Sequence, residues 1–540
     1  MKKREELVFP ARIIASGGDI DGIDNLLSKR ELAITFSPRN VTVLKATKDS
    51  RPFVVLDFGK ELQGALRISV ARSSATNMRV RITLGESVTE AMSSVGEKNA
   101  TNDHSPRDFE AITSNMGISD FGRSGFRFAR VELLDEGVMT LDGIAALLRT
   151  EDIERRGFIR TNDERFNEIL DTAIYTAFLC AQDGVIYDGI KRDRIIWSGD
   201  LNSEILTLAY AYGNVPNVKR SLRILMEATP RDEWMNTIPS YSAWWLINIC
   251  DYYMLSADVD FMGECADYAN NILQNLDKCI SDEGVIDFSK NGTPTSLPFY
   301  LDWPSYSTGD AYPGVLYLLL YAAKKLLATP YKAFDKALAR SISEKLSRAK
   351  RPELSMKQTT ALRSLVLGGT DGDRAFLENG GARGFNTFMS YFILKAESLL
   401  GCENVLGDAK QFYGGMLDRG ATTFWEDFSL DWLENSGRID AITPEGVLDI
   451  HADFGAFCYK GLRHSLCHGW SSGIVAWAIE EIVGLKILEP GFRKVSINPN
   501  LLTLTSLDAR IPTPVGDISI KIKVGEEPVI TLPEGVELEG

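Results

Sequence analysis

Hydrophobic and polar residues follow two different periods along the 540 residues of the chain. Up to about residue 150 they alternate in short runs rich in β-branched residues, which is typical of half-buried strands. The clearest runs are 53–57, 66–71, 78–84 and 126–134. We therefore predict an N-terminal β-sandwich domain over residues 1–155. The polar stretch 87–122 has neither period and is long for a connection, so we expect a functional or mobile loop there.

From residue 162 the spacing becomes helical. Phe166, Ile169, Leu170 and Ala173 recur at intervals of three and four, which predicts an amphipathic helix. Similar segments follow at 201–213, 217–228, 241–257, 259–279, 309–327, 331–349, 355–367, 387–400, 405–417, 453–463 and 471–485. About twelve helices in sequential hairpins can close into a double-walled barrel whose inner-helix ends form one pocket. We predict such a barrel over residues 156–487.

Strict alternation returns near the end of the chain. It covers 495–497 and 517–524, and this period of two predicts strands. We therefore expect a small C-terminal β-domain over residues 488–540.

Composition narrows the class of protein. With 44% hydrophobic and 25% charged residues, we expect a soluble chain of about two to four domains. The net charge of -15 argues against nucleic acid or an anionic membrane as a partner. The sequence contains no apolar run typical of a signal peptide or a membrane span, so we expect a cytoplasmic protein. Seven scattered cysteines indicate reduced thiols.

The segment 188–200 concentrates unusual chemistry between two helical patterns. It holds Asp188, Asp193 and Asp200, three cations and the indole of Trp197. Glycoside hydrolysis needs one carboxylic acid to protonate the leaving oxygen and a second carboxylate to activate water or attack. Cations beside carboxylates can separate their pKa values, and an indole offers a flat face to a sugar ring. The alternative interpretation is a solvated, salt-bridged loop.

A second segment repeats the pairing of acid and indole. Trp425 precedes Glu426, and three of the four histidines of the chain, His451, His464 and His468, lie within eighteen positions of one another. The histidines are interpreted either as core residues bonded to backbone carbonyls or as zinc ligands. His464 and His468 would share one helix face beside Cys467, but the glutamate of a zincin motif and a Cys-x-x-Cys pair are missing.

Taken in order, these motifs resemble the bacterial α-L-rhamnosidases of glycoside hydrolase family 78. The resemblance covers most of the chain. It rests on Asp-x-x-x-Arg-acid, Trp-x-Gly-Asp, Thr-Thr-x-Trp-Glu, Ser-Leu-x-His-Gly-Trp and Pro-Gly-Phe-x-x-Val-x-Ile-x-Pro, and at the front on the motifs around Asp57 and Gly64, Glu86, Asn102 to Asp108, and Gly125 to Arg130. It implies a multidomain six-hairpin glycosidase in which β-sandwich-like domains flank an (α/α)6 catalytic barrel. It also implies inverting hydrolysis of terminal rhamnosides without a metal or other cofactor.

The resemblance assigns roles to individual residues. Asp193 stands at the general acid and Glu426 at the general base, Asp188 and Asp200 match carboxylates that hold sugar hydroxyls, and His468 matches a histidine of the same pocket. The family has glutamate where this chain has Asp193, and an aspartate reaches about one methylene less far, which matters because a misplacement of about 1 Å can cost about a hundredfold in rate. Either the loop brings Asp193 closer, or Asp188 or Asp200 has taken the role, or the substrate or activity differs.

Further candidate binding residues come from the same segments and from one loop between helices. They are Arg192, Trp197, Trp303, Trp425 and Trp470, and we interpret Glu204 and Asp427 as surface or supporting carboxylates. We therefore predict an exo-glycosidase that acts on rhamnose-containing oligosaccharides or glycosides. The alternatives are an (α/α)6 glycosidase for another deoxy or uronic sugar and a catalytically weakened carbohydrate-binding homologue. The sequence does not predict an oligomeric state.

Overall fold

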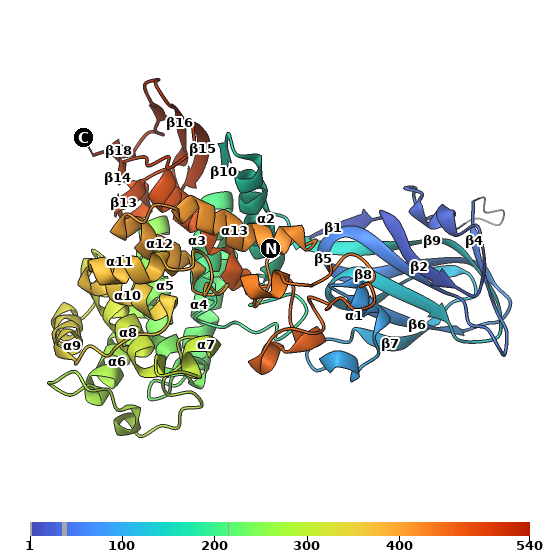
Figure 1. The fold of residues 1–540 in the computed structure, drawn as a ribbon, viewed down its shortest axis with the longest axis horizontal. Helices are drawn as coiled ribbons and strands as arrows, with labels where there is room; N and C mark the ends of the chain where they lie inside the picture. Colours follow the sequence, from blue (N-terminus) through green and yellow to red (C-terminus); the bar gives the residue numbers. More distant parts are fainter. Residues whose placement is uncertain (1–2, 35–39, 214, 540) are drawn as a thin grey trace. The chain divides into compact units, whose positions relative to one another are not determined.

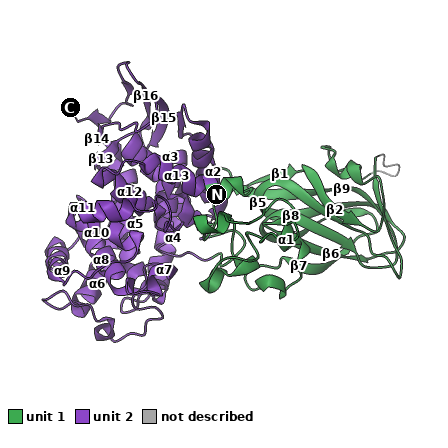
Figure 2. Cartoon of the chain, in the orientation of Figure 1, with its two compact units in different colours: residues 1–152, 189–194, 415–468 green, residues 153–188, 195–414, 469–540 purple. Residues whose placement is uncertain are grey.

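The chain forms two compact units (Figures 1 and 2). The computed structural model describes residues 3–34, 40–213 and 215–539. Unit 1 comprises Met1–Asp152, Gly189–Arg194 and Gly415–His468, and unit 2 comprises Ile153–Asp188, Ile195–Gly414 and Gly469–Gly540. Two segments that are distant in sequence from the N-terminal strands therefore belong to the same unit as those strands. The domain limits predicted at 155 and 487 stay predictions.

Unit 1 is built on one nine-stranded sheet in which the paired strands run antiparallel. The strand order is β3-β4-β9-β5-β8-β6-β7, with β1 paired to β9 and β2 to β5. The strands are β1 (Lys3–Val8), β2 (Arg12–Gly17), β3 (Asp19–Asp21), β4 (Thr42–Ala46), β5 (Phe53–Ser73), β6 (Met78–Gly85), β7 (Asp108–Thr113), β8 (Gly117–Leu133) and β9 (Gly137–Glu151). The strand-rich N-terminal region is confirmed, whereas its sandwich arrangement stays a prediction.

One long strand replaces two predicted ones. The runs 53–57 and 66–71 belong to β5, whose register shifts between Asp57 and Leu62 and again between Gly64 and Leu66. The alternation is lost between the two runs because Leu62 to Leu66 are all buried. A strand covered on both faces has no polar side to mark its period.

The stretch 87–122 is not a structureless loop. It contains α1 (Val88–Met92), the 3-10 turn η2 (Glu97–Asn99), β7 and the start of β8. Ser87 caps α1, because its side chain accepts a hydrogen bond from the backbone N–H of Glu90, an arrangement that satisfies one of the free donors at a helix start. This short helix fixes the buried carboxylate of Glu90 inside unit 1.

The later segments of unit 1 are tied to its sheet by buried charge. Arg127 on β8 donates two hydrogen bonds to the carboxylate of Asp57 on β5, at 2.8 and 3.0 Å, and a third to the carbonyl of Gly420 at 2.8 Å. The helix predicted at 453–463 is wrong. Only the 3-10 turns η6 (Phe457–Tyr459) and η7 (Gly461–Arg463) form there.

Helices dominate the chain from residue 164. They are α2 (Glu164–Cys180), α3 (Leu201–Tyr212), α4 (Pro216–Ala228), α5 (Pro239–Ser256), α6 (Val259–Cys279), α7 (Trp303–Tyr306), α8 (Ala311–Ala328), α9 (Lys336–Arg348), α10 (Lys357–Leu367), α11 (Asp371–Glu378), α12 (Ser390–Leu400), α13 (Val405–Asp418) and α14 (Ile474–Trp477). Most predicted helices are confirmed within a few residues, and α7 and α11 were missed. The segment predicted at 471–485 is helical but mixed: α14 follows the 3-10 turn η8 (Gly469–Gly473) and continues into a π-helical turn (Ala478–Ile482).

Six helices of unit 2 pack in a closed succession. α3 contacts α5, α5 contacts α8, α8 contacts α10, α10 contacts α12, α12 contacts α14, and α14 contacts α3. Outside this succession, α2 packs against α3, α4 and α6 pack against α5, and α9 packs against α8. We therefore expect site residues at the N-terminal ends of these six helices.

Two small sheets complete unit 2. One has the order β10-β15-β16-β17 and the other the order β13-β14-β18. Their strands are β10 (Phe158–Thr161), β13 (Leu485–Glu489), β14 (Lys494–Ile497), β15 (Ser506–Thr513), β16 (Gly516–Lys523), β17 (Val529–Thr531) and β18 (Glu537–Leu538), and β11 (Ala181–Gln182) and β12 (Val185–Ile186) form a short hairpin. The predicted C-terminal strands are confirmed as β14 and β16, but they lie in different sheets, and the sheet of β16 includes β10, which precedes the first helix of the unit. None of the helices that the structure describes is long and apolar enough to cross a membrane.

Candidate active site

The predicted site residues are divided between the two units. Arg192, Asp193, Trp425, Glu426 and His468 belong to unit 1. Unit 2 contains the remaining ones, which are Asp188, Trp197, Asp200, Trp303 and Trp470. Each set is described within its own unit.

In unit 1 one guanidinium joins the two carboxylates predicted to be catalytic. Nη1 of Arg192 donates to Oδ1 of Asp193 at 2.9 Å, and Nη2 forms an ion pair with Oε1 of Glu426. Arg192 and Glu426 are both buried, whereas the side chain of Asp193 is 20% exposed. The sequence separates these carboxylates by more than two hundred residues, and the fold brings them to neighbouring nitrogens of one side chain.

The backbone around Asp193 is strained. Asp193 and Arg194 have φ angles of 52° and 54°, in a left-handed region that ordinary residues adopt at a cost and that clusters at functional sites. Asp193 also lies 3.2 Å from Nε2 of His104. Gly125 allows the segment to approach β8, because its N–H donates to the carbonyl of Ile190 at 2.9 Å and a Cβ there would lie 2.3 Å from the Ile190 side chain.

Glu426 is fixed by its neighbours on both sides. Its N–H donates to the carbonyl of Ser465 at 3.0 Å, and the N–H of Ser465 donates back to Oε2 of Glu426 at 3.2 Å. Nε2 of His468 lies 4.0 Å from Oε1 of Glu426. Trp425 is fully buried and packs edge-on against Phe428, with ring centroids 5.7 Å apart. Its ring is therefore part of the packing beneath Glu426.

The three clustered histidines are buried. Burial lowers the pKa of His464 and of His468 well below the usual value, and burial together with Lys191 lowers the pKa of His451 to about 4. His464 accepts a hydrogen bond at Nε2 from the N–H of Asp427 at 2.8 Å. The helical turn on which the zinc alternative depends is not formed, because η7 ends at Arg463. The structure therefore places these rings in the packed interior of unit 1, as the core interpretation predicts.

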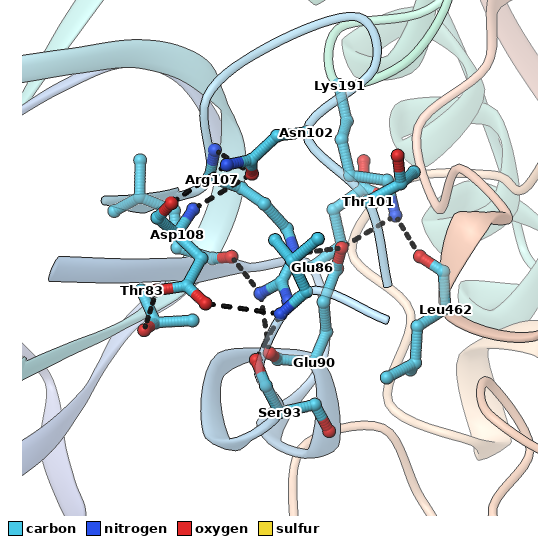
Figure 3. A network of polar contacts seen from close by, with 12 residues as sticks. Thr83, Glu86, Glu90, Ser93, Thr101, Asn102, Arg107, Asp108, Lys191 and Leu462 are labelled. Carbon is cyan, nitrogen blue, oxygen red and sulfur yellow. Dashed lines mark hydrogen bonds and ion pairs between the residues drawn. The ribbon is translucent and has the colours of Figure 1, made fainter. Parts of the chain in front are cut away.

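Three buried glutamates and a lysine lie behind this set, and of these only Lys191 had a predicted role, as one of the three cations beside the carboxylates of segment 188–200. Lys191 Nζ lies 3.0 Å from Glu86 and 3.1 Å from Glu90 (Figure 3). Burial raises the pKa of Glu86 to about 7 and that of Glu61 well above its usual value. Burial also acts on Glu90, but Lys191 and other cations outweigh it and lower the pKa.

The carboxylates of this cluster have the geometry of a cation site. Single ligand atoms of Glu86, Glu90 and His451 lie within 4.8 Å of one another. The ammonium of Lys191 already contacts both carboxylates at hydrogen-bond distance, so the positive charge that the cluster needs is supplied by the protein itself.

In unit 2 two of the predicted carboxylates are fixed by the local fold. Asp188 accepts a hydrogen bond at Oδ1 from the N–H of Ile195 at 3.0 Å, which closes the segment between them into a loop. Asp200 directly precedes α3 and accepts a hydrogen bond from the hydroxyl of Tyr241 on α5 at 3.2 Å. Burial and the Asp200 carboxylate raise the pKa of Tyr241 well above its usual value, so Tyr241 remains a donor to Asp200.

Of the two interpretations of Glu204, a surface or a supporting carboxylate, the surface one is wrong. Glu204 lies one turn after Asp200 on α3 and is fully buried. Burial, followed by Cys180, Asp200 and Asp188, raises its pKa well above the usual value. A Cβ at Gly469 would lie 1.6 Å from Oε1 of Glu204, so only glycine leaves room for this carboxyl group. The sequence pattern gave no sign of this burial because α3 is almost entirely buried.

Aromatic rings line the same ends of the helices. Trp197 meets Tyr241 edge to face with centroids 5.8 Å apart, and Trp303 meets Tyr300 in the same way at 5.2 Å. Trp470 is 7% exposed and stacks on Phe388 at 4.7 Å. Trp197 and Trp303 are half-buried, and each keeps part of its ring accessible. These two indoles have the exposure that a sugar-stacking residue requires.

Asp302, the residue directly before Trp303, is a functional candidate that was not predicted. It caps α7 by accepting from the N–H of Ser305 at 2.8 Å, and its other oxygen accepts from Gln358 and Asn386, both at 3.0 Å. Gln358 lies on α10, and Asn386 precedes α12. One buried carboxylate therefore joins three segments next to Trp303.

Comparison with known proteins adds a family match to this geometry. Residues 154–305 match the family model described as the bacterial alpha-L-rhamnosidase 6 hairpin glycosidase domain. An alpha-L-rhamnosidase of Alteromonas sp. (strain LOR) is 30% identical over 127 residues, which are 23% of this chain and 12% of that protein. This matched region is a small part of the Alteromonas protein.

Solved structures extend the likeness to the fold of most of the chain. A GH78 family rhamnosidase of Bacillus sp. GL1 superposes with a TM-score of 0.73 and 19% identity, covering 96% of this chain and 55% of that chain. A rhamnosidase of Klebsiella oxytoca, solved with rhamnose bound, has a TM-score of 0.66 and 19% identity and covers 88% and 96% of the two chains. The resemblance seen in the sequence motifs is therefore confirmed: residues 154–305 match the six-hairpin glycosidase domain of the bacterial α-L-rhamnosidases, and the fold of most of the chain is similar to that of a family 78 rhamnosidase.

Proposed function

We propose that the protein hydrolyses terminal α-L-rhamnosides with inversion, with Asp193 as general acid and Glu426 as general base. The observation that carries the proposal is the contact of Arg192 with both carboxylates, at 2.9 Å to Asp193 and as an ion pair to Glu426. Glycoside hydrolysis needs two such carboxyl groups, one as acid and one as base. The family match to residues 154–305 supports rhamnose as the sugar. The chain spans only part of the Bacillus and Alteromonas proteins, so the activity is a proposal for this chain.

The helices of unit 2 are proposed to form an (α/α)6 barrel. The closed succession α3-α5-α8-α10-α12-α14 supports an inner ring of six helices, each preceded by at least one helix of an outer wall. In such a barrel the inner helices run parallel, so that their N-terminal ends meet at one end. Asp200, Tyr241 and Trp470 all lie at such ends.

Substrate contacts follow from charge and exposure. We assign the sugar hydroxyls to Asp188, Asp200 and His468, and the apolar ring faces to the half-buried Trp197 and Trp303. The remaining members of the predicted binding set are assigned supporting roles: Arg192 orients the catalytic carboxylates, Trp425 packs against Phe428, and Trp470 stacks on Phe388.

The reaction requires two proton transfers. Asp193 gives its proton to the glycosidic oxygen as the bond to the anomeric carbon breaks. Glu426 takes a proton from the water that attacks the opposite face of the sugar, in the geometry of carboxyl groups about 6.5–9.5 Å apart that inverting enzymes use. After product release, proton exchange with solvent restores both groups.

Leaving-group dependence tests these assignments. Asp193→Asn should slow hydrolysis of rhamnosides with poor leaving groups far more than that of nitrophenyl rhamnoside, because only the former need protonation. Glu426→Gln should slow both kinds, and azide should restore part of the rate because it attacks without losing a proton. Asp120→Asn, an exposed aspartate on β8 of the same unit, is the matched control and should leave both rates unchanged.

A panel of nitrophenyl glycosides separates the alternatives. Turnover of a sugar other than rhamnose reassigns the substrate, and binding without turnover makes the chain a carbohydrate-binding homologue. If Asp193→Asn slows both kinds of leaving group equally while Asp188→Asn or Asp200→Asn discriminates between them, the proton donor is one of the latter two.

A further inference from the structure

The ammonium of Lys191 is held in a cage of four oxygens. Its side chain is 8% exposed, and Nζ donates to the carboxylates of Glu86 and Glu90 and to the carbonyls of Leu462 and His464, at 3.0, 3.1, 3.2 and 2.6 Å (Figure 3). A buried ammonium is costly unless it is paired and hydrogen-bonded. The function proposed above uses none of the five residues of this cage.

One connection leads from the cage to the proposed acid and base along the backbone. Lys191 directly precedes Arg192, whose guanidinium contacts both Asp193 and Glu426. Fixing the ammonium of Lys191 therefore fixes the start of the strained turn at Asp193. A turn with two successive positive φ angles needs such external support to persist.

A second connection leads to Glu426 through hydrogen bonds. Oε2 of Glu86 accepts from the N–H of Leu466 at 2.6 Å, and Oε1 is 3.4 Å from the hydroxyl of Ser465. Ser465 in turn forms two hydrogen bonds with Glu426: its carbonyl accepts from the N–H of Glu426 at 3.0 Å, and its N–H donates to the Glu426 carboxylate at 3.2 Å. Glu86 is thus bound both to the residue before Arg192 and to the segment that holds Glu426.

The far side of Glu86 is held by α1. The backbone N–H of Glu86 donates to Oε2 of Glu90 at 2.8 Å. Arg107 donates to the carbonyls of Glu90 and Ser93 at 2.9 and 2.8 Å (Figure 3). His451 closes the arrangement, with Nδ1 2.7 Å from the hydroxyl of Ser87 and Nε2 2.9 Å from the carbonyl of His464. The carboxylate of Glu86 therefore has little freedom to move.

We propose that Glu86 and Lys191 are positioning residues for the proposed general base, which hold the Arg192–Glu426 ion pair in place from two sides. The inference rests on the proposed function and deepens it. Glu86 and Lys191 touch no substrate. They fix the turn that carries Arg192 and the segment at Ser465. Loss of either residue therefore changes the placement of Glu426 while every group that contacts the sugar stays in the chain.

The substitution Glu86→Gln keeps the size of the side chain and one acceptor but removes the charge that binds Lys191. We expect kcat to fall about 10- to 100-fold, the range in which small misplacements of catalytic groups act, with KM changed less than threefold. The loss should be equal for nitrophenyl rhamnoside and for rhamnosides with poor leaving groups, because water activation is needed for both. Glu110→Gln, the same substitution on an exposed glutamate of β7, is the matched control.

A double-mutant cycle distinguishes positioning from a general loss of structure. If Glu86 acts through Glu426, then Glu86→Gln should cause no further loss of rate in a Glu426→Gln background. Equal fractional losses in both backgrounds, or a kcat within twofold of wild type for the single variant, would overturn the inference. Should Glu86→Gln fail to fold, the neutral pair Glu86→Gln with Lys191→Met replaces it in the same cycle, with the same outcomes.

Crystal structures separate a failure of this inference from a failure of the proposed function. If the wild type hydrolyses no rhamnoside, or if Glu426→Gln leaves its activity intact, the proposed function is wrong. The contact between Nη2 of Arg192 and Glu426 can still be compared in the wild type and in Glu86→Gln. Its loss in the variant supports the positioning role, and its retention, with the turn at Asp193 unchanged, overturns that role whatever the activity.

Discussion

Arg192 and Glu426 form an ion pair in which both side chains are almost fully buried, with 4% and 3% of their surfaces exposed. A planar guanidinium can contact two carboxylates at once, whereas the ammonium of a lysine is a single point of charge. Arg192 uses this property, because its other terminal nitrogen contacts Asp193. The pair therefore determines the relative placement of the proposed acid and base.

The first prediction follows from this geometry. Arg192→Lys should lower kcat/KM for nitrophenyl rhamnoside about 100-fold, the scale seen when one hydrogen-bond donor of a catalytic site is lost, because lysine keeps the charge but cannot contact both carboxylates. Steady-state kinetics measure this loss of activity, and a melting curve measures any change in stability separately. Arg419→Lys, which changes a partly buried arginine elsewhere in unit 1, should change kcat/KM less than twofold. Equal activity of Arg192→Lys and wild type would show that the bridge is not needed.

A second prediction concerns the approach of Gly125 to Ile190. Gly125→Ala should push the segment 189–194 away from β8, because the new Cβ would lie 2.3 Å from Cγ1 and 3.0 Å from the backbone of Ile190. Overpacking of this kind costs about 1–3 kcal/mol, and the shift should lower kcat more than tenfold. Chemical denaturation and kinetics measure the two effects. The matched substitution Gly446→Ala, where a Cβ meets no atom within 4 Å, should leave kcat unchanged despite the cost of its positive φ angle.

The third prediction concerns Glu204, whose pKa burial raises well above its usual value. As pH rises above 4.5, the unfolded chain loses this proton while the native state keeps it, so the stability of the wild type falls. Each pH unit over which this difference persists costs about 1.36 kcal/mol. Glu204→Gln has no such proton, so its free energy of unfolding should exceed that of the wild type at pH 8 and approach it near pH 4. Urea titrations at both pH values measure the difference.

The same substitution at an exposed position is the control for Glu204. Glu227→Gln on α4 should change stability by less than about 0.5 kcal/mol at either pH, as surface substitutions do. A variant Glu204→Gln that is less stable than the wild type at pH 8 would mean that the carboxyl group is ionised in the folded protein.

Amphipathic periodicity predicted the helices that have one buried face well and the fully buried elements less well. α4, α6 and α9 each have one buried face, so their spacing of three and four is visible in the sequence. α5 is buried on nearly all sides, including both Trp244 and Trp245. Its length and apolar character still predicted a helix, but no pattern could tell which of its faces meets the site.

Charged residues were the hardest to interpret from sequence. A lysine followed by Arg-Asp-Arg is typical of a solvated loop, yet Lys191 is buried by partners about one hundred residues before it and more than two hundred and seventy after it. The motif comparison identified Asp193 and Glu426 because the residues next to them in the sequence match motifs of the family. The cage behind them has no local sequence signal, since its members share a site only after the sheet has formed.

The last prediction concerns acid stability and His451, whose buried ring has its pKa lowered from 6.5 to about 4 by burial and by Lys191. Below pH 6.5 the unfolded chain binds a proton on this residue that the native state does not accept, so stability falls as pH decreases from 6.5 to about 4. His451→Gln cannot bind the proton, and its amide can still contact Ser87 or the carbonyl of His464. Relative to its own value at pH 7, the variant should therefore lose about 1–2 kcal/mol less than the wild type at pH 5. Glu86 titrates over an overlapping range with the opposite effect, so the quantity to measure is the difference between wild type and variant in guanidinium titrations at pH 7 and pH 5. An identical loss of stability in both proteins would place the charge-sensitive group elsewhere, with the buried His464 and His468 as the next residues to replace.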